Sequence, residues 1–125
     1  MFNVFRSFFS TARPVSPATM AQASTKVQDL INKSSVVVFS KSYCPYCRAT
    51  KQTLDGLKVE YDLLELDQES DGAALQDALE EISGQRTVPN VYIKQKHIGG
   101  NSDVQSLQKS GKLETLLKDA GALKA

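Results

Sequence analysis

The architecture of this chain follows from residues 36–47, Val36-Val37-Val38-Phe39-Ser40-Lys41-Ser42-Tyr43-Cys44-Pro45-Tyr46-Cys47. The apolar run at the start is typical of a strand that is buried on both faces, and a helix-like stretch follows the second cysteine. Such a strand would bring the cysteines to one edge of a sheet, where the helix aims its backbone N–H groups at the first sulfur. Those amides and the helix dipole stabilise a thiolate, which is the reactive form of cysteine. The Cys-x-x-Cys spacing therefore predicts a redox dithiol.

Three other uses of Cys44 and Cys47 fit the sequence less well. A structural disulfide across so short a loop would restrict the unfolded chain very little. A zinc ion normally takes four ligands, and the chain has no second cysteine pair and only one histidine, His97. Two inert buried cysteines are disfavoured by Pro45, which suits the exposed first turn of a helix. We therefore expect catalytic cysteines in a reducing compartment and no metal site.

The composition indicates one domain with a tail. The 125 residues are 41% hydrophobic, which is enough for a single core. The 15 basic and 14 acidic side chains nearly balance, so we expect no nucleic-acid partner. No segment reaches the roughly 18 apolar residues of a membrane span, so we expect no membrane association.

The charges are unevenly distributed along the chain. The first acidic residue is Asp29, whereas Arg6 and Arg13 lie in a leader that is rich in Ser, Thr and Phe. An amphipathic, arginine-containing and acid-free N-terminus is typical of a mitochondrial transit peptide; a tail without a targeting role is the alternative. We expect residues 1–23 to be a disordered targeting segment and linker, and residues 24–125 to form the domain. Because Met20 provides a second potential start, the protein is expected in the mitochondrial matrix, the cytoplasm or both.

Hydrophobic periodicity and capping residues predict the other elements. The first helix is expected to start at Ser24 or Thr25. The elements that follow the buried strand are a helix from the dithiol to Gly56, a strand over residues 59–64, a helix after Ser70 or Asp71 that ends at Gly84, a hairpin over residues 91–98, a helix capped by Ser102 and a last helix after Gly111. This order predicts an α/β fold in which a mixed sheet carries helices on both faces.

Three motifs in this order resemble those of the glutaredoxin family. They are the dithiol segment Lys41–Cys47, the segment Gly84–Pro89 with an expected cis-proline, and His97–Asp103, in which a glycine pair leads into a capped helix. The resemblance covers residues 25–123 and is nearest in pattern to the fungal mitochondrial and cytosolic dithiol glutaredoxins. It implies a thioredoxin-like fold with a four-stranded mixed sheet that is flanked by helices on both faces.

The resemblance implies a glutathione-dependent thiol–disulfide oxidoreductase that reduces protein disulfides and protein–glutathione mixed disulfides. Cys44, at the helix start, would be the nucleophile, and the deeper Cys47 would resolve the mixed disulfide. Val88, before a cis-Pro89, would pair with the cysteinyl part of glutathione like an added strand. The glutathione-binding residues implied by the resemblance are Lys41, Tyr46, Gln76, Arg86, Thr87, Val88, Pro89, Ser102 and Asp103.

Charge gives several of these assignments a physical reason. Lys41 lies three residues before the nucleophile and is expected to support the thiolate and to meet a glutathione carboxylate. Gln76 and Arg86 stand at the family's positions for the glycine carboxylate. The helix N-terminus at Ser102 would bind the γ-glutamyl carboxylate, although a plain helix cap would look the same. Asp103 would pair with the γ-glutamyl ammonium.

Three other functions stay open at this point. One is a purely structural adaptor with a thioredoxin fold, which would leave an intact dithiol without a use. Thioredoxins place Trp-Cys-Gly-Pro-Cys at the site, but this chain has no tryptophan. An iron–sulfur cluster carrier would hold a cluster between Cys44 of two subunits and two glutathiones, but Pro45 stands where cluster-binding relatives generally carry Gly or Ser. We expect a monomer without a bound cofactor that uses glutathione as its reducing co-substrate. Its expected partners are glutathionylated and disulfide-containing proteins and, indirectly, glutathione reductase. His97 is expected to be structural, and the acidic stretch 62–71 to be a solvated edge.

Overall fold

The computed structural model describes residues 17–123. Its sheet contains the strands β1 (Val36–Ser40), β2 (Asp62–Glu65), β3 (Asn90–Ile93) and β4 (Lys96–Gly99), in the order β2-β1-β3-β4. β1 runs parallel to β2 and antiparallel to β3, and β3 and β4 form an antiparallel hairpin. The mixed four-stranded sheet that the sequence predicts is confirmed.

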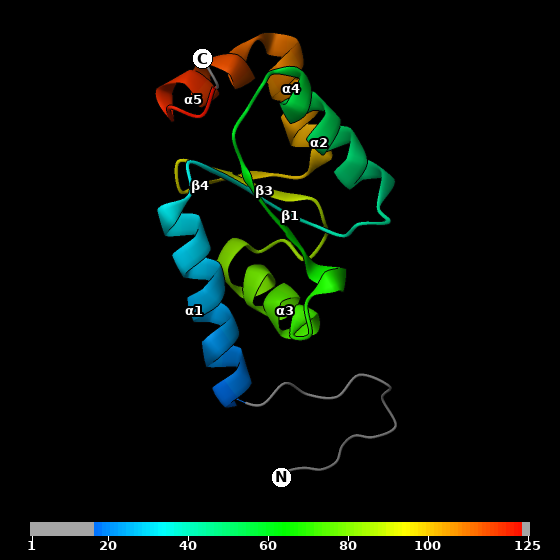
Figure 1. Ribbon diagram of the computed structural model, residues 1–125, viewed down its shortest axis with the longest axis vertical. Coiled ribbons are helices and arrows are strands. Elements are labelled where there is room, and N and C mark those ends of the chain that lie inside the picture. The colour runs from blue at the N-terminus through cyan, green and yellow to red at the C-terminus, as the bar shows by residue number, and fades with distance from the viewer. Residues whose placement is uncertain (1–16, 124–125) are drawn as a thin grey trace.

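Helices cover both faces of this sheet (Figure 1). α1 (Pro17–Lys33) and α3 (Gly72–Ser83) pack on one face, while α2 (Pro45–Gly56), α4 (Asn101–Ser110) and α5 (Lys112–Asp119) pack on the other. A short 3₁₀ helix, η1 (Leu66–Gln68), follows β2. Among residues 17–123, no helix combines the length and the apolar character needed to cross a bilayer.

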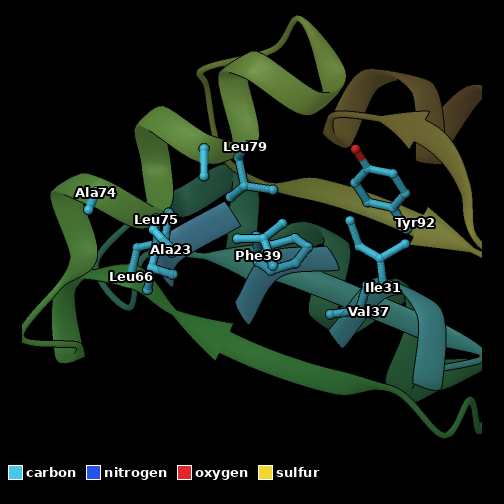
Figure 2. Close-up of a cluster of buried hydrophobic side chains, with 11 residues drawn as sticks. Ala23, Ile31, Val37, Phe39, Leu66, Ala74, Leu75, Leu79 and Tyr92 are labelled. Atoms are coloured by element: carbon cyan, nitrogen blue, oxygen red, sulfur yellow. The ribbon is translucent and has the colours of Figure 1, made fainter. Parts of the chain in front are cut away.

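The position of β1 explains why its sequence is an unbroken apolar run. Val37 and Phe39 join the cluster on the α1–α3 side, where Leu79 also lies (Figure 2). Val36 and Val38 join the cluster on the opposite side, against α2, α4 and α5. All five residues of β1 are buried. Because both faces of this strand are covered, each large side chain stabilises the fold by about 1.5–3 kcal/mol. The strand ends at the loop that carries the dithiol.

The first helix begins at Pro17, so the start expected at Ser24 or Thr25 is wrong. Proline is tolerated in the first turn of a helix, and residues 18–23 include several good helix formers. Ala23 is only 1% exposed, and Met20 packs against the same cluster. Residues 17–23 are therefore helical, and the expected domain boundary at residue 24 falls inside α1. Residues 1–16 of the predicted targeting segment lie outside the described residues.

Two further elements differ from their predicted bounds. β2 begins at Asp62, because Val59 forms only an isolated bridge to the C-terminal end of the described chain. α4 begins before Ser102, so Gly100 is the N-cap residue and Ser102 lies within the first turn. Asp103 reaches back instead, and its Oδ2 accepts a hydrogen bond from the Gly100 N–H at 2.9 Å. A carboxylate at this third helical position satisfies an amide that no helical carbonyl can reach.

Candidate active site

The two cysteines occupy different environments at the start of α2. Cys44 is the N-cap residue of this helix and is partly exposed. Pro45 follows in the first turn, and the Arg48 N–H donates to the Cys44 carbonyl at 3.1 Å. Cys47 lies one turn into the helix and is fully buried. Both thiols are free, so one accessible and one enclosed sulfur stand where β1 delivers the chain to α2.

These surroundings move the pKa values of the two thiols in opposite directions. Desolvation is the largest single effect and opposes ionisation of Cys44, whereas the Cys47 backbone N–H and thiol favour the thiolate. With help from the Tyr46 backbone N–H and the charge of Lys41, they hold the pKa of Cys44 below its usual range. Burial raises the pKa of Cys47, against hydrogen bonds from Ser40 and from the Lys41 N–H. Since the thiolate is the attacking species, Cys44 is the better nucleophile of the pair.

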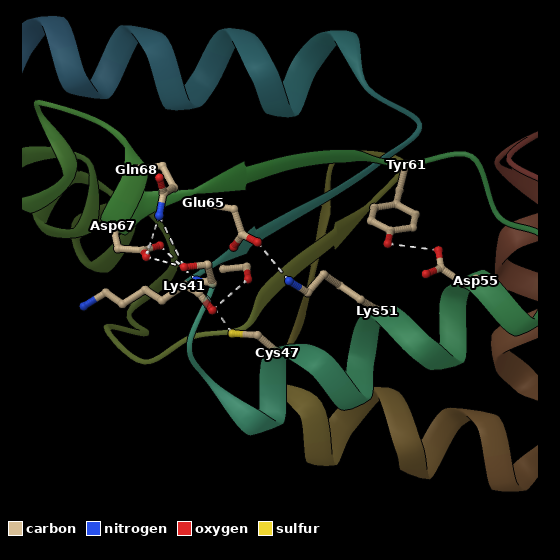
Figure 3. A network of polar contacts seen from close by, with 10 residues as sticks. Lys41, Cys47, Lys51, Asp55, Tyr61, Glu65, Asp67 and Gln68 are labelled. Atoms are coloured by element: carbon tan, nitrogen blue, oxygen red, sulfur yellow. Dashed lines mark hydrogen bonds and ion pairs between the residues drawn. The ribbon is translucent and has the colours of Figure 1, made fainter.

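An aspartate from the acidic stretch holds the loop before the dithiol. Asp67, in η1, accepts hydrogen bonds from the Ser42 N–H at 2.9 Å and from the Ser42 hydroxyl at 2.5 Å (Figure 3). Hydrogen bonds from Ser42 lower the pKa of Asp67. In the same network, the Lys41 N–H donates to Cys47 Sγ at 3.5 Å. Asp67 is exposed, as expected for a solvated edge, but it also binds the loop before the dithiol. No local sequence pattern predicts the contact between Ser42 and Asp67, which lie 25 positions apart.

A groove opens beside the partly exposed thiol. The Val88–Pro89 peptide bond is cis, as the motif predicts, and the Val88 carbonyl oxygen lies 3.9 Å from Cys44 Sγ. The groove has a volume of 460 Å³ and is formed by the segment before β3, the start of α4 and one side chain of α2. Five of the nine predicted glutathione-binding residues line it: Tyr46, Thr87, Val88, Pro89 and Ser102.

The other four predicted binding residues lie outside the lining of this groove. They are Lys41, Gln76, Arg86 and Asp103. Gln76 Nε2 donates to the Arg86 carbonyl at 3.0 Å, so these two residues do lie together. The Arg86 guanidinium forms ion pairs with Asp77 at 2.6 Å and with Glu80 at 3.0 Å, both on α3. Its positive charge is therefore already partly offset within the fold.

Comparison with known proteins points to one family. The glutaredoxin profile matches residues 36–98, from the buried strand through the dithiol to the hairpin. A glutaredoxin of Vernicia fordii is 53% identical over 82% of this chain and 99% of that protein. Glutaredoxin-C2 of Arabidopsis thaliana is 50% identical over 81% of this chain and 91% of that protein. These relatives are plant proteins and lend no support to the predicted nearness to fungal members.

The structural comparison agrees. A crystal structure of a buckwheat glutaredoxin–glutathione complex is similar with a TM-score of 0.86 and 46% identity, over 88% of this chain and 100% of that chain. Fold, thiol pair and sequence thus agree, and the chain belongs to the glutaredoxin family of glutathione-dependent thiol–disulfide oxidoreductases.

Proposed function

We propose that Cys44 performs the thiol exchange with glutathionylated proteins. Its thiolate attacks the glutathione sulfur of the mixed disulfide, so that a disulfide forms between Cys44 and glutathione. The protein sulfur leaves as a thiolate and takes up a proton. The thiolate of a second glutathione then attacks the glutathione sulfur on Cys44. This step releases glutathione disulfide and restores the Cys44 thiolate, so glutathione is oxidised and the protein is reduced.

For a protein disulfide, Cys47 acts as the resolving thiol. Cys44 first forms a mixed disulfide with one substrate sulfur, and the other substrate sulfur leaves as a thiol. Cys47, deprotonated, then attacks Cys44, which frees the substrate and closes the Cys44–Cys47 disulfide. Two glutathiones reduce that disulfide and become glutathione disulfide. The burial and raised pKa of Cys47 favour this order, because the enclosed thiol ionises less readily than Cys44.

Glutathione is proposed to bind along the groove, with its cysteinyl part paired to the Val88 backbone and Tyr46 and Thr87 at its sides. Lys41, Gln76 and Arg86 would meet its glycine end. Ser102 and Asp103, at the start of α4, would meet its γ-glutamyl end, where free helix amides favour a carboxylate. The observation that carries this proposal is the 3.9 Å separation between Cys44 Sγ and the Val88 carbonyl. It puts the nucleophile within reach of any peptide that pairs with this segment.

An assay with a glutathionylated small-molecule disulfide, coupled to glutathione reductase, tests the proposal directly. Wild-type protein should turn over this substrate, and Cys44→Ser should be inactive because no other accessible thiol is placed to attack. Asp103→Lys should raise KM and leave kcat nearly unchanged, since it would repel the γ-glutamyl ammonium. An active Cys44→Ser variant would refute the assignment of the nucleophile. A change of kcat alone in Asp103→Lys would refute its binding role.

We further propose a monomer that holds no resident cofactor. Pro45, in the first turn of α2, stiffens the loop in which a shared iron–sulfur cluster would need Cys44 as a ligand. The purified protein should therefore be colourless and elute as a single chain in size-exclusion chromatography. A brown chromophore that dithionite bleaches would instead support the cluster-carrier alternative.

The cellular location is proposed from the N-terminal leader. A basic, acid-free segment before α1 should carry a fused reporter into mitochondria. Starts at Met1 and at Met20 would give one matrix form and one cytosolic form, since Met20 lies within α1 and most of the fold follows it. Met20→Leu should deplete the cytosolic pool only. A reporter that is wholly cytosolic with Met1 in use would refute the targeting role.

A further inference from the structure

The amide of Gln85 binds two backbone carbonyls of the cis-proline segment. Gln85 Nε2 lies 2.9 Å from the Thr87 carbonyl oxygen and 2.9 Å from the Pro89 carbonyl oxygen. Both acceptors are carbonyls, so the atom that faces them must be the nitrogen of the amide, with both of its hydrogens engaged. One side chain thereby fixes the residues immediately before and after Val88.

The oxygen of the same amide faces His97, on β4. Gln85 Oε1 lies 3.2 Å from His97 Nε2. An amide oxygen can only accept a hydrogen bond, so His97 Nε2 must carry the hydrogen and donate it. The His97 ring is held in turn by the Tyr92 ring, whose centroid lies 5.2 Å away. The histidine that the sequence leaves without a chemical role therefore fixes which way the Gln85 amide points.

The backbone of Gln85 is fixed as well. Its N–H donates to the Ser83 hydroxyl at 3.1 Å, and that hydroxyl donates to the Leu79 carbonyl of α3 at 2.7 Å. The Asn90 side chain, at the start of β3, donates to the same hydroxyl at 3.1 Å. Gln85 is thus tied to α3 and β3 through its backbone and to β4 through its side chain.

We propose that Gln85, oriented by His97, is a positioning residue that sets the direction in which Val88 offers its N–H to glutathione. Val88–Pro89 is the cis peptide bond of this segment, so the Thr87–Val88 unit is trans and planar. In such a unit the C=O and the N–H point in opposite directions. Because Gln85 binds the Thr87 carbonyl, the Val88 N–H is directed away from Gln85. This inference rests on the proposed binding of glutathione to Val88.

The test is Gln85→Glu, which keeps the shape of the side chain but replaces both N–H donors by an acceptor. In the assay coupled to glutathione reductase, KM for the glutathionylated substrate should rise about tenfold, with kcat nearly unchanged. The single-turnover reaction of reduced protein with dithiobis(nitrobenzoic acid), which contains no glutathione, should keep its rate. Gln95→Glu is the matched control. Gln95 also donates to a backbone carbonyl, that of Asn32 at 3.1 Å, but in the turn at the far end of the hairpin.

The outcomes separate this inference from the proposed function. An inactive wild-type protein would contradict the function itself. An active wild type with an unchanged KM in Gln85→Glu would overturn the positioning role, and so would an equal loss of rate with both substrates. If Gln85→Glu does not fold, nitrogen NMR of the wild type still decides. His97 should show hydrogen on Nε2 when neutral, and hydrogen on Nδ1 alone would overturn the proposal.

Discussion

Gly99→Ala should damage both the fold and the glutathione end of the site. Gly99 ends β4 with a φ of +124°, a conformation that side-chain-bearing residues rarely adopt. A Cβ built at this position would lie 2.2 Å from Asp103 Oδ2 and 2.7 Å from Asp103 Cγ. The same Oδ2 accepts the hydrogen bond from the Gly100 N–H that caps α4. An added methyl group must therefore displace the cap.

The size of the effect follows from two separate costs. A residue forced into a sparsely populated backbone region costs on the order of 1–3 kcal/mol. Loss of a capping hydrogen bond at the start of a helix costs about 0.5–2 kcal/mol. We therefore expect Gly99→Ala to lower the free energy of unfolding by roughly 2–4 kcal/mol, which for a domain of this size lowers Tm by on the order of 10 °C. KM for glutathionylated substrates should rise, since the clash displaces Asp103, which is proposed to meet the γ-glutamyl end of glutathione.

Urea unfolding and the coupled assay measure the two effects. Gly56→Ala is the control: no atom lies within 4 Å of its added Cβ, and alanine in a helix is about as stable as glycine or better. In the double variant Gly99→Ala/Asp103→Ala the two closest atoms of Asp103 are absent and the steric cost falls. The double variant should therefore lose less stability than the sum of the losses of the two single variants. Strict additivity would refute the clash. A Gly99→Ala variant as stable as Gly56→Ala would refute the whole argument.

Three further outcomes are expected. Cys47→Ser should retain deglutathionylation and lose most reduction of intramolecular protein disulfides; equal loss of both activities would contradict its resolving role. Lys41→Ala should raise the pKa of Cys44, seen as a shift of thiolate absorbance and of the acid limb of activity to higher pH, because one of the causes of the lowered pKa is removed. Burial, and then the hydrogen bond to Asp55, raises the pKa of Tyr61 to about 12. The fold therefore favours the neutral phenol. Its contribution to the free energy of unfolding is complete below the free pKa of ~10 and is lost as pH rises toward 12. Tyr61→Phe should remove this pH dependence of the free energy of unfolding between those two values.

The features that the sequence predicts correctly are those with a local cause. The run Val36–Phe39 is apolar because helices cover both faces of β1. Gly84 and Gly111 end α3 and α4 in left-handed conformations, with φ values of 78° and 80°, which is the usual reason for glycine at that place. The cis bond at Pro89, by contrast, is expected only from the family resemblance of its segment, and it is confirmed.

The features that the sequence does not predict depend on tertiary contacts. The start of α1 at Pro17 is favoured by the burial of Ala23 in a core that forms only when α1, α3 and the sheet meet. In the sequence Asp67 is one of several neighbouring acids, and only the fold of η1 places it against Ser42. In the sequence Gln85 is a polar residue after a helix, and only the fold places it against His97 of β4. Each of these contacts joins different segments of the chain, and hydrophobic periodicity predicts the segments but not the contacts between them.

The two cations expected at the site, Arg86 and Lys41, differ in whether carboxylates already neutralise them. Arg86 contacts Asp77 at 2.6 Å and Glu80 at 3.0 Å, so a carboxylate that approaches it competes with two acids already in place. Among residues 17–123, Lys41 makes no such ion pair, and its ammonium extends away from the loop that Asp67 holds (Figure 3). Lys41 therefore carries an uncompensated positive charge in the loop before the dithiol, and this charge acts on Cys44. The same charge is one of several causes that lower the pKa of Cys44, and in the proposed binding mode it would also attract an anionic tripeptide.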